Sequence, residues 1–559
     1  MKKQLLFALA ILLATVSFGQ LSGIKSIPGD YPTIAAAVTD LNTVGVGSGG
    51  VTFNVNPGYT ESITAPITIL ATGTSANPIV FQKNGPGTNP LVGRTDAGSN
   101  ATSTYGGLGD AVIRIDGGDY ITFDGIDVAA AQSGIEYGYF TFKTATNACK
   151  NLTIRNCAVN LNKGTSGYVI GIYISNGPTG TGNSAGVTVS DAGGRTENVV
   201  LAGNSILNVH SGIHVRGSSA SGFGDLNLVI GQSGAGNSIM NFGGGSATTT
   251  YGIYLVYQGG FDVNYNTIDN AGGGGTNHGS TLYGIYNATP GSAGVCNFNN
   301  NTIILGQSST SAAHCIYDAT VQTSKSFSFN TFGYGAFAST TTSYIIYNSS
   351  TTPDVTVTNN QLAGPITKTS ASGTFYVYYN LGSPTAGTET FSNNDFSDIN
   401  TAAGTGSLFG YYSNTAVGQN RVCSNNTFRN WTANGTCYVL YCVSTNNNTV
   451  TGNNVSNINT TGTLYGLYAT GTNPTVSGNL ISGLTTSGST LYALYDAGTG
   501  TSNVFKNRVC NLTCNNATPT LYGILVSVGI SQNLFNNLVG NLYAPSANSG
   551  DAIRGIAIT

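Results

Sequence analysis

Charged residues are scarce in this chain. Only 19 Lys and Arg and 22 Asp and Glu occur among 559 residues, and the formal net charge is −3. A protein that binds nucleic acid has to neutralise several phosphates at once, usually with a clustered basic surface. The composition therefore argues against a nucleic-acid partner.

Long apolar runs are missing after the first 20 residues. A membrane-spanning helix needs about 20 consecutive apolar residues, so we expect no transmembrane segment. The amino end has the parts of an export signal: a basic start at 1–3, an apolar stretch over 5–16 and small residues just before the cut. We predict a signal peptide over 1–19 and a mature protein that begins at Gln20. Such a protein is secreted or held at the outer cell surface.

Metal-binding side chains are also few. The chain has four His and nine Cys, and no His lies beside a pair of Cys. Structural zinc sites need four such ligands at short, regular spacings, so we predict no zinc site. Nine cysteines suit an oxidising compartment but leave at least one unpaired. We expect structural disulfides or buried thiols.

The chain is rich in Gly (78), Tyr (31) and Phe (22). Aromatic and β-branched residues favour strands, whereas Gly and Asn favour tight turns, so we predict many short strands and almost no helix. A short phrase of Asn, a variable residue and an apolar residue recurs at spacings of 25 to 35 residues. It occurs at Asn204, Asn237, Asn266, Asn301, Asn330, Asn360, Asn394, Asn426, Asn454, Asn479, Asn507 and Asn537.

A second phrase, typically Gly-Ile-Tyr, runs in step with the first. Units this short bury a core only when they stack, as in solenoid proteins. We therefore predict an all-β right-handed parallel β-helix, with an Asn amide ladder along its axis and stacked Tyr side chains. An exposed Tyr column is a candidate surface for sugar rings, and a packing ladder is the alternative. The ligand-binding candidates are Tyr254, Tyr286, Tyr468 and Tyr495.

The amino end of the mature chain differs from the repeats. The segment Asp30-Tyr-Pro-Thr33, followed by Ile34, Val38 and Leu41, predicts a capped helix with one apolar stripe. We expect this helix to cover the first coil. The predicted organisation is a signal peptide over 1–19, a cap with the first coils over 20–105 and repeats over 106–559. The chain stops inside an expected strand, which suggests a truncated reading frame.

These features carry a resemblance. The entry segment DYPTIAAAVTDLN resembles that of pectin-lyase-like proteins, and the repeats from about residue 110 resemble right-handed parallel β-helix repeat proteins of that superfamily. The chain as a whole is similar to surface proteins of gliding Gram-negative bacteria exported by the type IX system. Such a resemblance implies the fold and an action on, or binding to, polysaccharide. The carboxylate, His and Trp motifs of the pectin-processing enzymes are not present.

Acidic residues cluster early in the repeats. Because side chains alternate between the two faces of a strand, Arg114, Asp116 and Asp124 face outward, with Asp119 and Asp127 nearby. Stacked coils could bring these carboxylates together as a calcium site at Asp116, Asp119, Asp124 and Asp127, or as acid and base groups acting on a glycan. The alternative is that they are ordinary turn residues.

A further candidate is the segment His210-Ser-Gly-Ile-His214-Val-Arg216. On a strand, residues 210, 214 and 216 share one face, which is outward if Ile213 points inward. His214 and Arg216 could then bind a sugar carboxylate and move a proton. A solvated face is the alternative.

The sequence favours a secreted or cell-surface β-helix protein that binds glycans as an adhesin does, without catalysis. The rival hypothesis is a polysaccharide lyase or glycoside hydrolase acting on acidic polysaccharide. We expect a monomer whose partners are polysaccharides or cell-surface glycans. No cofactor is required, and Ca²⁺ is possible.

Overall fold

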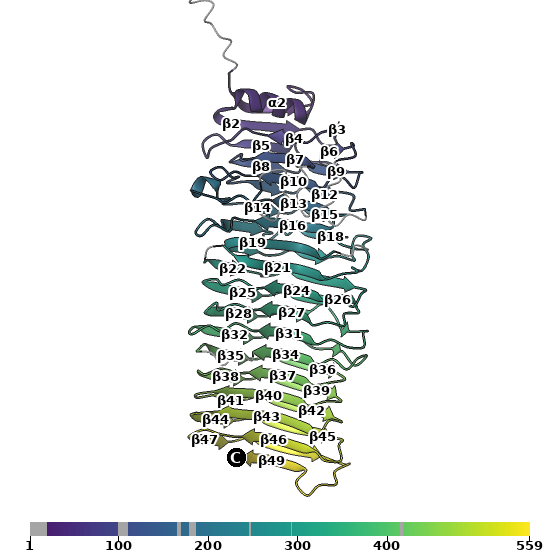
Figure 1. The fold of residues 1–559 in the computed structure, drawn as a ribbon, viewed down its shortest axis with the longest axis vertical. Coiled ribbons are helices and arrows are strands. Elements are labelled where there is room, and N and C mark those ends of the chain that lie inside the picture. Colours follow the sequence, from purple (N-terminus) through teal and green to yellow (C-terminus); the bar gives the residue numbers. More distant parts are fainter. Residues whose placement is uncertain are drawn as a thin grey trace, which may run out of the picture.

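The computed structural model describes residues 19–98, 110–164, 169–177, 186–244, 248–291, 293–413 and 418–559. The described chain is a right-handed parallel β-helix of about 17 turns, with 53% strand and 3% helix. Figure 1 shows a tall stack of coils that runs from helix α2 to strand β49. The predicted fold class is thus confirmed. The predicted signal peptide, apart from residue 19, and the predicted boundary after residue 105 lie outside the described residues.

Most coils contribute one strand to each of three parallel ladders. The first ladder runs down the middle of Figure 1. It contains β4 (Ile67–Ile69), β7 (Ala111–Asp116), β10 (Tyr137–Phe142), β13 (Ile170–Ile174), β16 (Ser211–Arg216), β19 (Thr250–Val263), β21 (Leu282–Pro290), β24 (Ala313–Asp318), β27 (Ser343–Asn348), β31 (Phe375–Asn380), β34 (Leu408–Ser413), β37 (Cys437–Cys442), β40 (Leu464–Gly471), β43 (Thr490–Gly498), β46 (Thr520–Val526) and β49 (Ile553–Ile558).

The second ladder lies to the left of the first in Figure 1. It contains β1 (Leu21–Ile27), β2 (Val46–Val55), β5 (Ile79–Lys83), β8 (Ile121–Asp124), β11 (Thr153–Arg155), β14 (Val200–Ala202), β17 (Asp225–Ile230), the end of β19, β22 (Val295–Asn297), β25 (Ser324–Ser328), β28 (Asp354–Thr358), β32 (Thr388–Ser392), β35 (Asn420–Ser424), β38 (Asn448–Thr451), β41 (Thr475–Ser477), β44 (Thr501–Phe505) and β47 (Ser531–Phe535).

The third ladder lies to the right and is divided into two sheets between residues 362 and 366. It contains β3 (Thr60–Ile63), β6 (Leu91–Arg94), β9 (Asp127–Ala130), β12 (Ala158–Asn160), β15 (Ser205–Leu207), β18 (Ser238–Met240), β20 (Thr267–Asp269), β23 (Thr302–Gln307), β26 (Thr331–Phe337), β29 (Gln361–Leu362), β30 (Ile366–Thr367), β33 (Ile399–Asn400), β36 (Thr427–Thr432), β39 (Asn454–Thr460), β42 (Leu480–Thr486), β45 (Arg508–Cys514) and β48 (Leu538–Tyr543).

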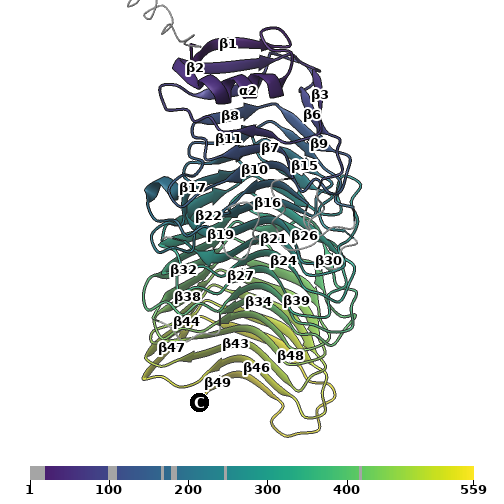
Figure 2. The same cartoon turned by 45° about the horizontal axis from the view of Figure 1, so that its top comes forward.

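The helix α2 (Ile34–Val44) covers the amino end of the coils, as Figure 2 shows. The side chain of Thr33 accepts a hydrogen bond from the Ala36 N–H at 3.0 Å and so caps the helix. The apolar stripe of the helix, which includes Ile34 and Leu41, is buried against the first coils. The predicted cap is therefore confirmed. No helix among the described residues is long and apolar enough to cross a membrane.

An asparagine ladder follows the corner between the second and third ladders. From Asn204 to Asn507, each Asn side chain donates from Nδ2 to Oδ1 of the Asn in the next coil, at 2.9 to 3.2 Å. These side chains are buried, and the same Nδ2 atoms also donate to backbone carbonyls. The predicted amide ladder is present with one correction. Its ninth member is Asn453, because Asn454 is the variable residue of that phrase.

All nine cysteines are free thiols. Eight are buried and Cys510 is partly exposed, so the buried-thiol alternative describes the structure and the disulfide alternative does not. Burial raises the pKa of Cys149, Cys157 and Cys315 to about 12, which keeps these thiols protonated and unreactive. The cysteines serve as small apolar side chains of the core.

Candidate functional site: an aromatic stripe on the first ladder

Two adjacent rows of aromatic side chains face outward along the first ladder; we call them together the aromatic stripe. In most of these coils one aromatic residue is followed, three positions later, by a second. The first row contains Tyr251, Tyr283, His314, Tyr344, Tyr376, Phe409, Tyr438, Tyr465, Tyr492 and Tyr522. The second row contains Tyr173, His214, Tyr254, Tyr286, Tyr317, Tyr347, Tyr379, Tyr412, Tyr441, Tyr468 and Tyr495.

The three-residue spacing needs a local departure from strand alternation, which would place positions i and i+2 on one face. The register pairs Tyr251 with Tyr283 and Ile253 with Ile285, and it leaves out Gly252. A Cβ added to Gly252 would lie 2.5 Å from the Ile268 side chain, so this residue points into the core. Two successive residues therefore face inward, and the flanking rings share the outer face. The partner strand has the same departure at Gly284, since the register stays continuous from Tyr251 to Ile253.

Many rings of the stripe are stacked on a neighbour. Tyr251 and Tyr283 have centroids 5.4 Å apart and an interplanar angle of 15°, and Tyr441 and Tyr468 have values of 4.6 Å and 15°. Stacking along the axis covers the ring faces and leaves edges and hydroxyl groups at the surface. Where the rings are stacked, the stripe is the packing ladder that the sequence offered as the alternative.

A few rings are turned. Tyr465 lies at 77° to Tyr438, 88° to Tyr468 and 67° to Tyr492, so its plane runs along the solenoid axis. Tyr495 is turned in the same way, at 75° to Tyr468 and 19° to Tyr465. Both side chains are partly exposed. Tyr465 and Tyr495 are stacked on each other only at a distance, with centroids 6.5 Å apart, and their contacts with Tyr468 and Tyr492 are T-shaped.

The stripe carries no charge near neutral pH. Burial among the other rings raises the pKa of Tyr283, Tyr412 and Tyr468 to about 12. The phenols therefore stay protonated and can donate as well as accept hydrogen bonds. A neutral surface of aromatic rings and hydroxyl groups is suited to uncharged polyols better than to phosphates.

The structure places all four predicted Tyr residues in the second row of the stripe. Tyr254, Tyr286 and Tyr468 belong to stacked runs, and Tyr495 is one of the turned rings. Sequence reasoning missed the first row. The signal was an aromatic residue directly before most of these phrases, three positions before the Tyr, which strand alternation assigns to the opposite face.

The predicted acidic cluster is spread over all three ladders and its carboxylates are already engaged. Asp116 forms a bidentate ion pair with Arg114, at 2.6 and 2.7 Å. Asp124 pairs with Arg155 at 2.8 Å. Asp119 and Asp127 accept backbone N–H groups at 2.7 Å, as turn residues do. No group of three or more His, Cys, Asp or Glu that could hold a metal ion occurs in the described part of the chain. Calcium binding remains a prediction.

The histidine segment differs from the expected solvated face. His214 lies in the second row, where rings of Tyr173, Tyr251 and Tyr254 surround it, and it is 2% exposed. Burial, followed by the charge of His210 and Arg216, lowers the pKa of His214 to about 3. A histidine with this pKa stays neutral near pH 7 and cannot exchange protons there, so the proton-transfer role is not supported. His210 is also buried, with a pKa of about 3.

A groove that the sequence did not reveal lies on the third ladder. Asp395, Asp398 and Arg429 line a hollow of about 150 Å³. All three side chains are exposed. Asp398 accepts a hydrogen bond from Asn430 Nδ2 at 2.8 Å, and Asp395 accepts from Ser397. Arg429 is about thirty residues away in the sequence, and the stacking of coils brings it beside the carboxylates.

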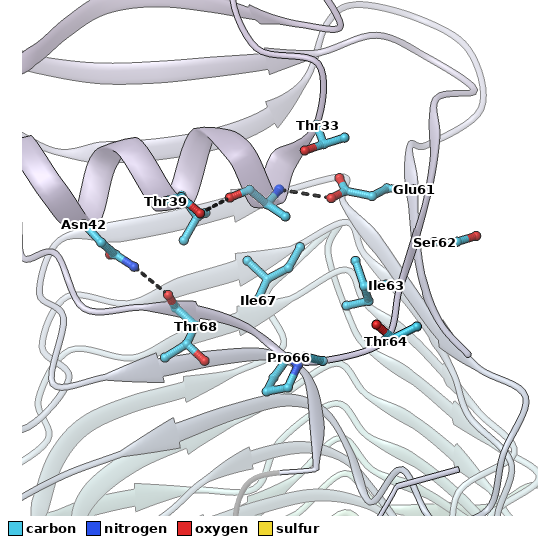
Figure 3. Close-up of a pocket in the computed structure, with 13 residues that line it drawn as sticks. Thr33, Thr39, Asn42, Glu61, Ser62, Ile63, Thr64, Pro66, Ile67 and Thr68 are labelled. Atoms are coloured by element: carbon cyan, nitrogen blue, oxygen red, sulfur yellow. Dashed lines mark hydrogen bonds between the residues drawn. The ribbon is translucent and has the colours of Figure 1, made fainter. Parts of the chain in front are cut away.

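A larger groove of about 470 Å³ lies between the cap helix and the segment 61–68 (Figure 3). Its buried floor includes Val38, Ile63 and Ile67. Both oxygens of Glu61 accept backbone N–H groups of the first helical turn, at 2.7 and 3.0 Å. The carboxylate therefore stabilises the helix N-terminus, and we assign no ligand to this groove.

No family model and no curated protein matches this chain. Solved structures with a similar arrangement include the GH136 lacto-N-biosidase of Eubacterium ramulus, with 10% identity, a TM-score of 0.33 and coverage of 74% of this chain and 62% of that one. They also include PfbA, a surface adhesin of Streptococcus pneumoniae, with 11% identity, a TM-score of 0.26 and coverage of 94% and 90%. A mannuronic acid specific polysaccharide family 6 lyase from human gut microbiota has 10% identity, a TM-score of 0.21 and coverage of 96% and 91%. Because these likenesses are distant, function has to be argued from the surface of this chain.

Proposed function

We propose that this protein is a secreted or cell-surface β-helix that binds glycan chains along its aromatic stripe without cleaving them. The observation that carries the proposal is the pair of turned rings, Tyr465 and Tyr495. The apolar C–H face of a sugar ring lies flat on an aromatic face, and a ring that is stacked closely on both faces offers only its edge. The planes of these two rings run along the axis, so a glycan that follows the axis would meet them face on.

The test is binding of the mature chain to alginate, polygalacturonate, xylan and mixed-linkage glucan, measured by biolayer interferometry. For whichever glycan binds, we expect Tyr465→Leu and Tyr495→Leu each to remove about 1 kcal/mol, which is about fivefold in Kd. Tyr441→Leu is the matched control, because both faces of Tyr441 are stacked, at 5.0 Å on Tyr412 and 4.6 Å on Tyr468. Equal losses in all three variants, or binding to none of the glycans, would contradict the proposal.

A second candidate function rests on the groove of Asp395, Asp398 and Arg429. Two carboxylates beside a guanidinium could bind an acidic sugar and exchange protons with it, as a polysaccharide lyase or hydrolase requires. The assay is for new reducing or unsaturated ends on the same glycans. Activity lost in Asp395→Asn or Asp398→Asn, but kept in the exposed control Asp354→Asn, would make this an enzyme and replace the binding proposal.

A further inference from the structure

Buried ion pairs occur at the inner corner where the first ladder turns into the second. Lys143 contacts Asp225 at 2.9 Å, and their side chains are 1% and 3% exposed. Several coils further along the solenoid, Lys325 contacts Asp318, and both side chains are fully buried. The two sites have the same charges and similar burial, yet their surroundings differ.

The Lys325 amine lies in contact with an amide as well as a carboxylate. Its Nζ contacts Asp318 Oδ2, donates to Ser350 Oγ at 2.7 Å and to Asn348 Oδ1 at 3.2 Å, and also reaches the carbonyl oxygen of Thr320. Burial lowers the pKa of Lys325, which favours the neutral, nucleophilic form of the amine. Asp318 is placed to take the proton that the amine gives up.

The carboxamide of Asn348 is held as an electrophile would be. Its oxygen accepts hydrogen bonds from Lys325 and from Ser350 Oγ, the latter at 3.0 Å, which draws electron density from the carbonyl carbon. Its Nδ2 donates to Asn380 Oδ1 at 3.2 Å, so the nitrogen that would leave is fixed on the side away from the amine. Nucleophile, proton acceptor, oxyanion donor and leaving group thus meet in one water-excluded space.

We propose that Lys325 and Asn348 form an isopeptide bond within the folded chain. Asp318 takes a proton from the Lys325 ammonium, and the free amine attacks Asn348 Cγ to form a new C–N bond. Ser350 stabilises the developing oxyanion. Asp318 then relays protons from the attacking nitrogen to the amide nitrogen, the original C–N bond breaks, and ammonium leaves. In total, one ammonium side chain and one carboxamide give a secondary amide and an ammonium ion, and no oxidant or reductant takes part.

The bond would connect β25 to the end of β27, that is, one coil to the next, through the solenoid interior. The Lys143 site provides an internal comparison. Among the hydrogen bonds of the described residues, Lys143 Nζ contacts only Asp225, and no side-chain amide accepts from it. An anionic carboxylate is a poor electrophile, so this pair is expected to stay ionic.

The test is peptide mapping by mass spectrometry of the purified folded protein, digested under denaturing conditions. The expected result is a branched peptide that joins the segments with Lys325 and Asn348 and is lighter by one ammonia molecule. The mass of the intact protein would not be sufficient, because an N-terminal Gln20 also loses ammonia when it cyclises, and peptide mapping separates the two reactions. Lys325→Arg and Asp318→Asn should give linear peptides, and Lys143→Arg should keep the cross-link.

Linear peptides of full mass from the wild-type chain would overturn the proposal. A cross-link lighter by one water molecule would also overturn it, because it would place the bond on Asp318. If circular dichroism shows that either variant, at Lys325 or at Asp318, does not fold, the presence or absence of the branched peptide in the wild-type map decides whether the bond forms.

Discussion

The asparagine ladder allows a stability prediction from a single side chain. Asn360 is 1% exposed, and four hydrogen bonds converge on its amide. Nδ2 donates to the carbonyl of Phe327 at 2.8 Å and to Asn394 Oδ1 at 2.9 Å. Oδ1 accepts from the backbone N–H and the side chain of Asn330, at 2.9 and 3.0 Å. Asn360→Ala removes all four bonds at once.

The expected loss of unfolding free energy follows from the buried polar groups that Asn360→Ala leaves without a partner. The Asn330 N–H, one Asn330 Nδ2–H and the Phe327 carbonyl all lose this partner inside the solenoid. A buried group without a partner costs about 1–3 kcal/mol, so three of them predict roughly 3–6 kcal/mol after some relaxation. Asn533→Ala is the control, because Asn533 is exposed and donates to Asn503 Oδ1 at 3.0 Å. An exposed substitution of this kind costs about 0.5 kcal/mol or less.

The assay is urea unfolding followed by circular dichroism and by the fluorescence of Trp431, the single tryptophan, which is 1% exposed. Two probes are needed because solenoids can unfold in parts. Asn360→Asp tests the direction in which stability changes with pH. A carboxylate there faces two acceptors, Phe327 O and Asn394 Oδ1, so its pKa in the folded protein rises and stability returns as the pH falls. Equal, small losses in Asn360→Ala and Asn533→Ala would refute the reasoning.

Three further predictions concern buried and acidic groups. Burial raises the pKa of Asp496 to about 6, so the folded protein gains stability as the pH falls from about 6 to about 4. In thermal melts, Asp496→Asn should therefore stabilise the protein at pH 7 by up to about 3 kcal/mol and have no effect near pH 4. Arg421 and Glu389 are fully buried with a 3.3 Å contact, so Arg421→Met alone should cost about 3–5 kcal/mol in urea unfolding, and adding Glu389→Gln should recover most of that loss. If Ca²⁺ binds the acidic cluster, it should raise the Tm, and Asp124→Asn should abolish that increase; an unchanged Tm in the wild type would exclude the site.

The sequence determined the fold because every coil repeats the same signals. The Asn phrase marked one corner of the solenoid, and the apolar residue after each Asn marked the core. The one error in this set, Asn454 for Asn453, came from two adjacent Asn residues, of which only the first fits the phrase. The cap helix was predictable for a similar reason, since Thr33 and the stripe from Ile34 to Leu41 form a local pattern.

The surface was less predictable because coil stacking determines it. A strand period of two places residues i and i+3 on opposite faces, whereas the inward-facing pair Gly252 and Ile253 puts Tyr251 and Tyr254 on the same face. His214 does face outward, as alternation implies, but rings from neighbouring coils cover it. The groove of Asp395 and Arg429 joins residues of different coils, whose proximity depends on loop lengths that no local pattern reveals.

The asparagine ladder also has an electrical consequence. Every Asn from 204 to 507 donates to the next coil, so the amide dipoles all point the same way along the axis. Backbone dipoles in a sheet largely cancel, whereas these side-chain dipoles add, and neighbouring hydrogen bonds polarise one another in a low-dielectric interior. The solenoid is therefore a permanently polarised rod. Its positive end lies toward Asn537, and it has this polarity although the chain contains few charged residues.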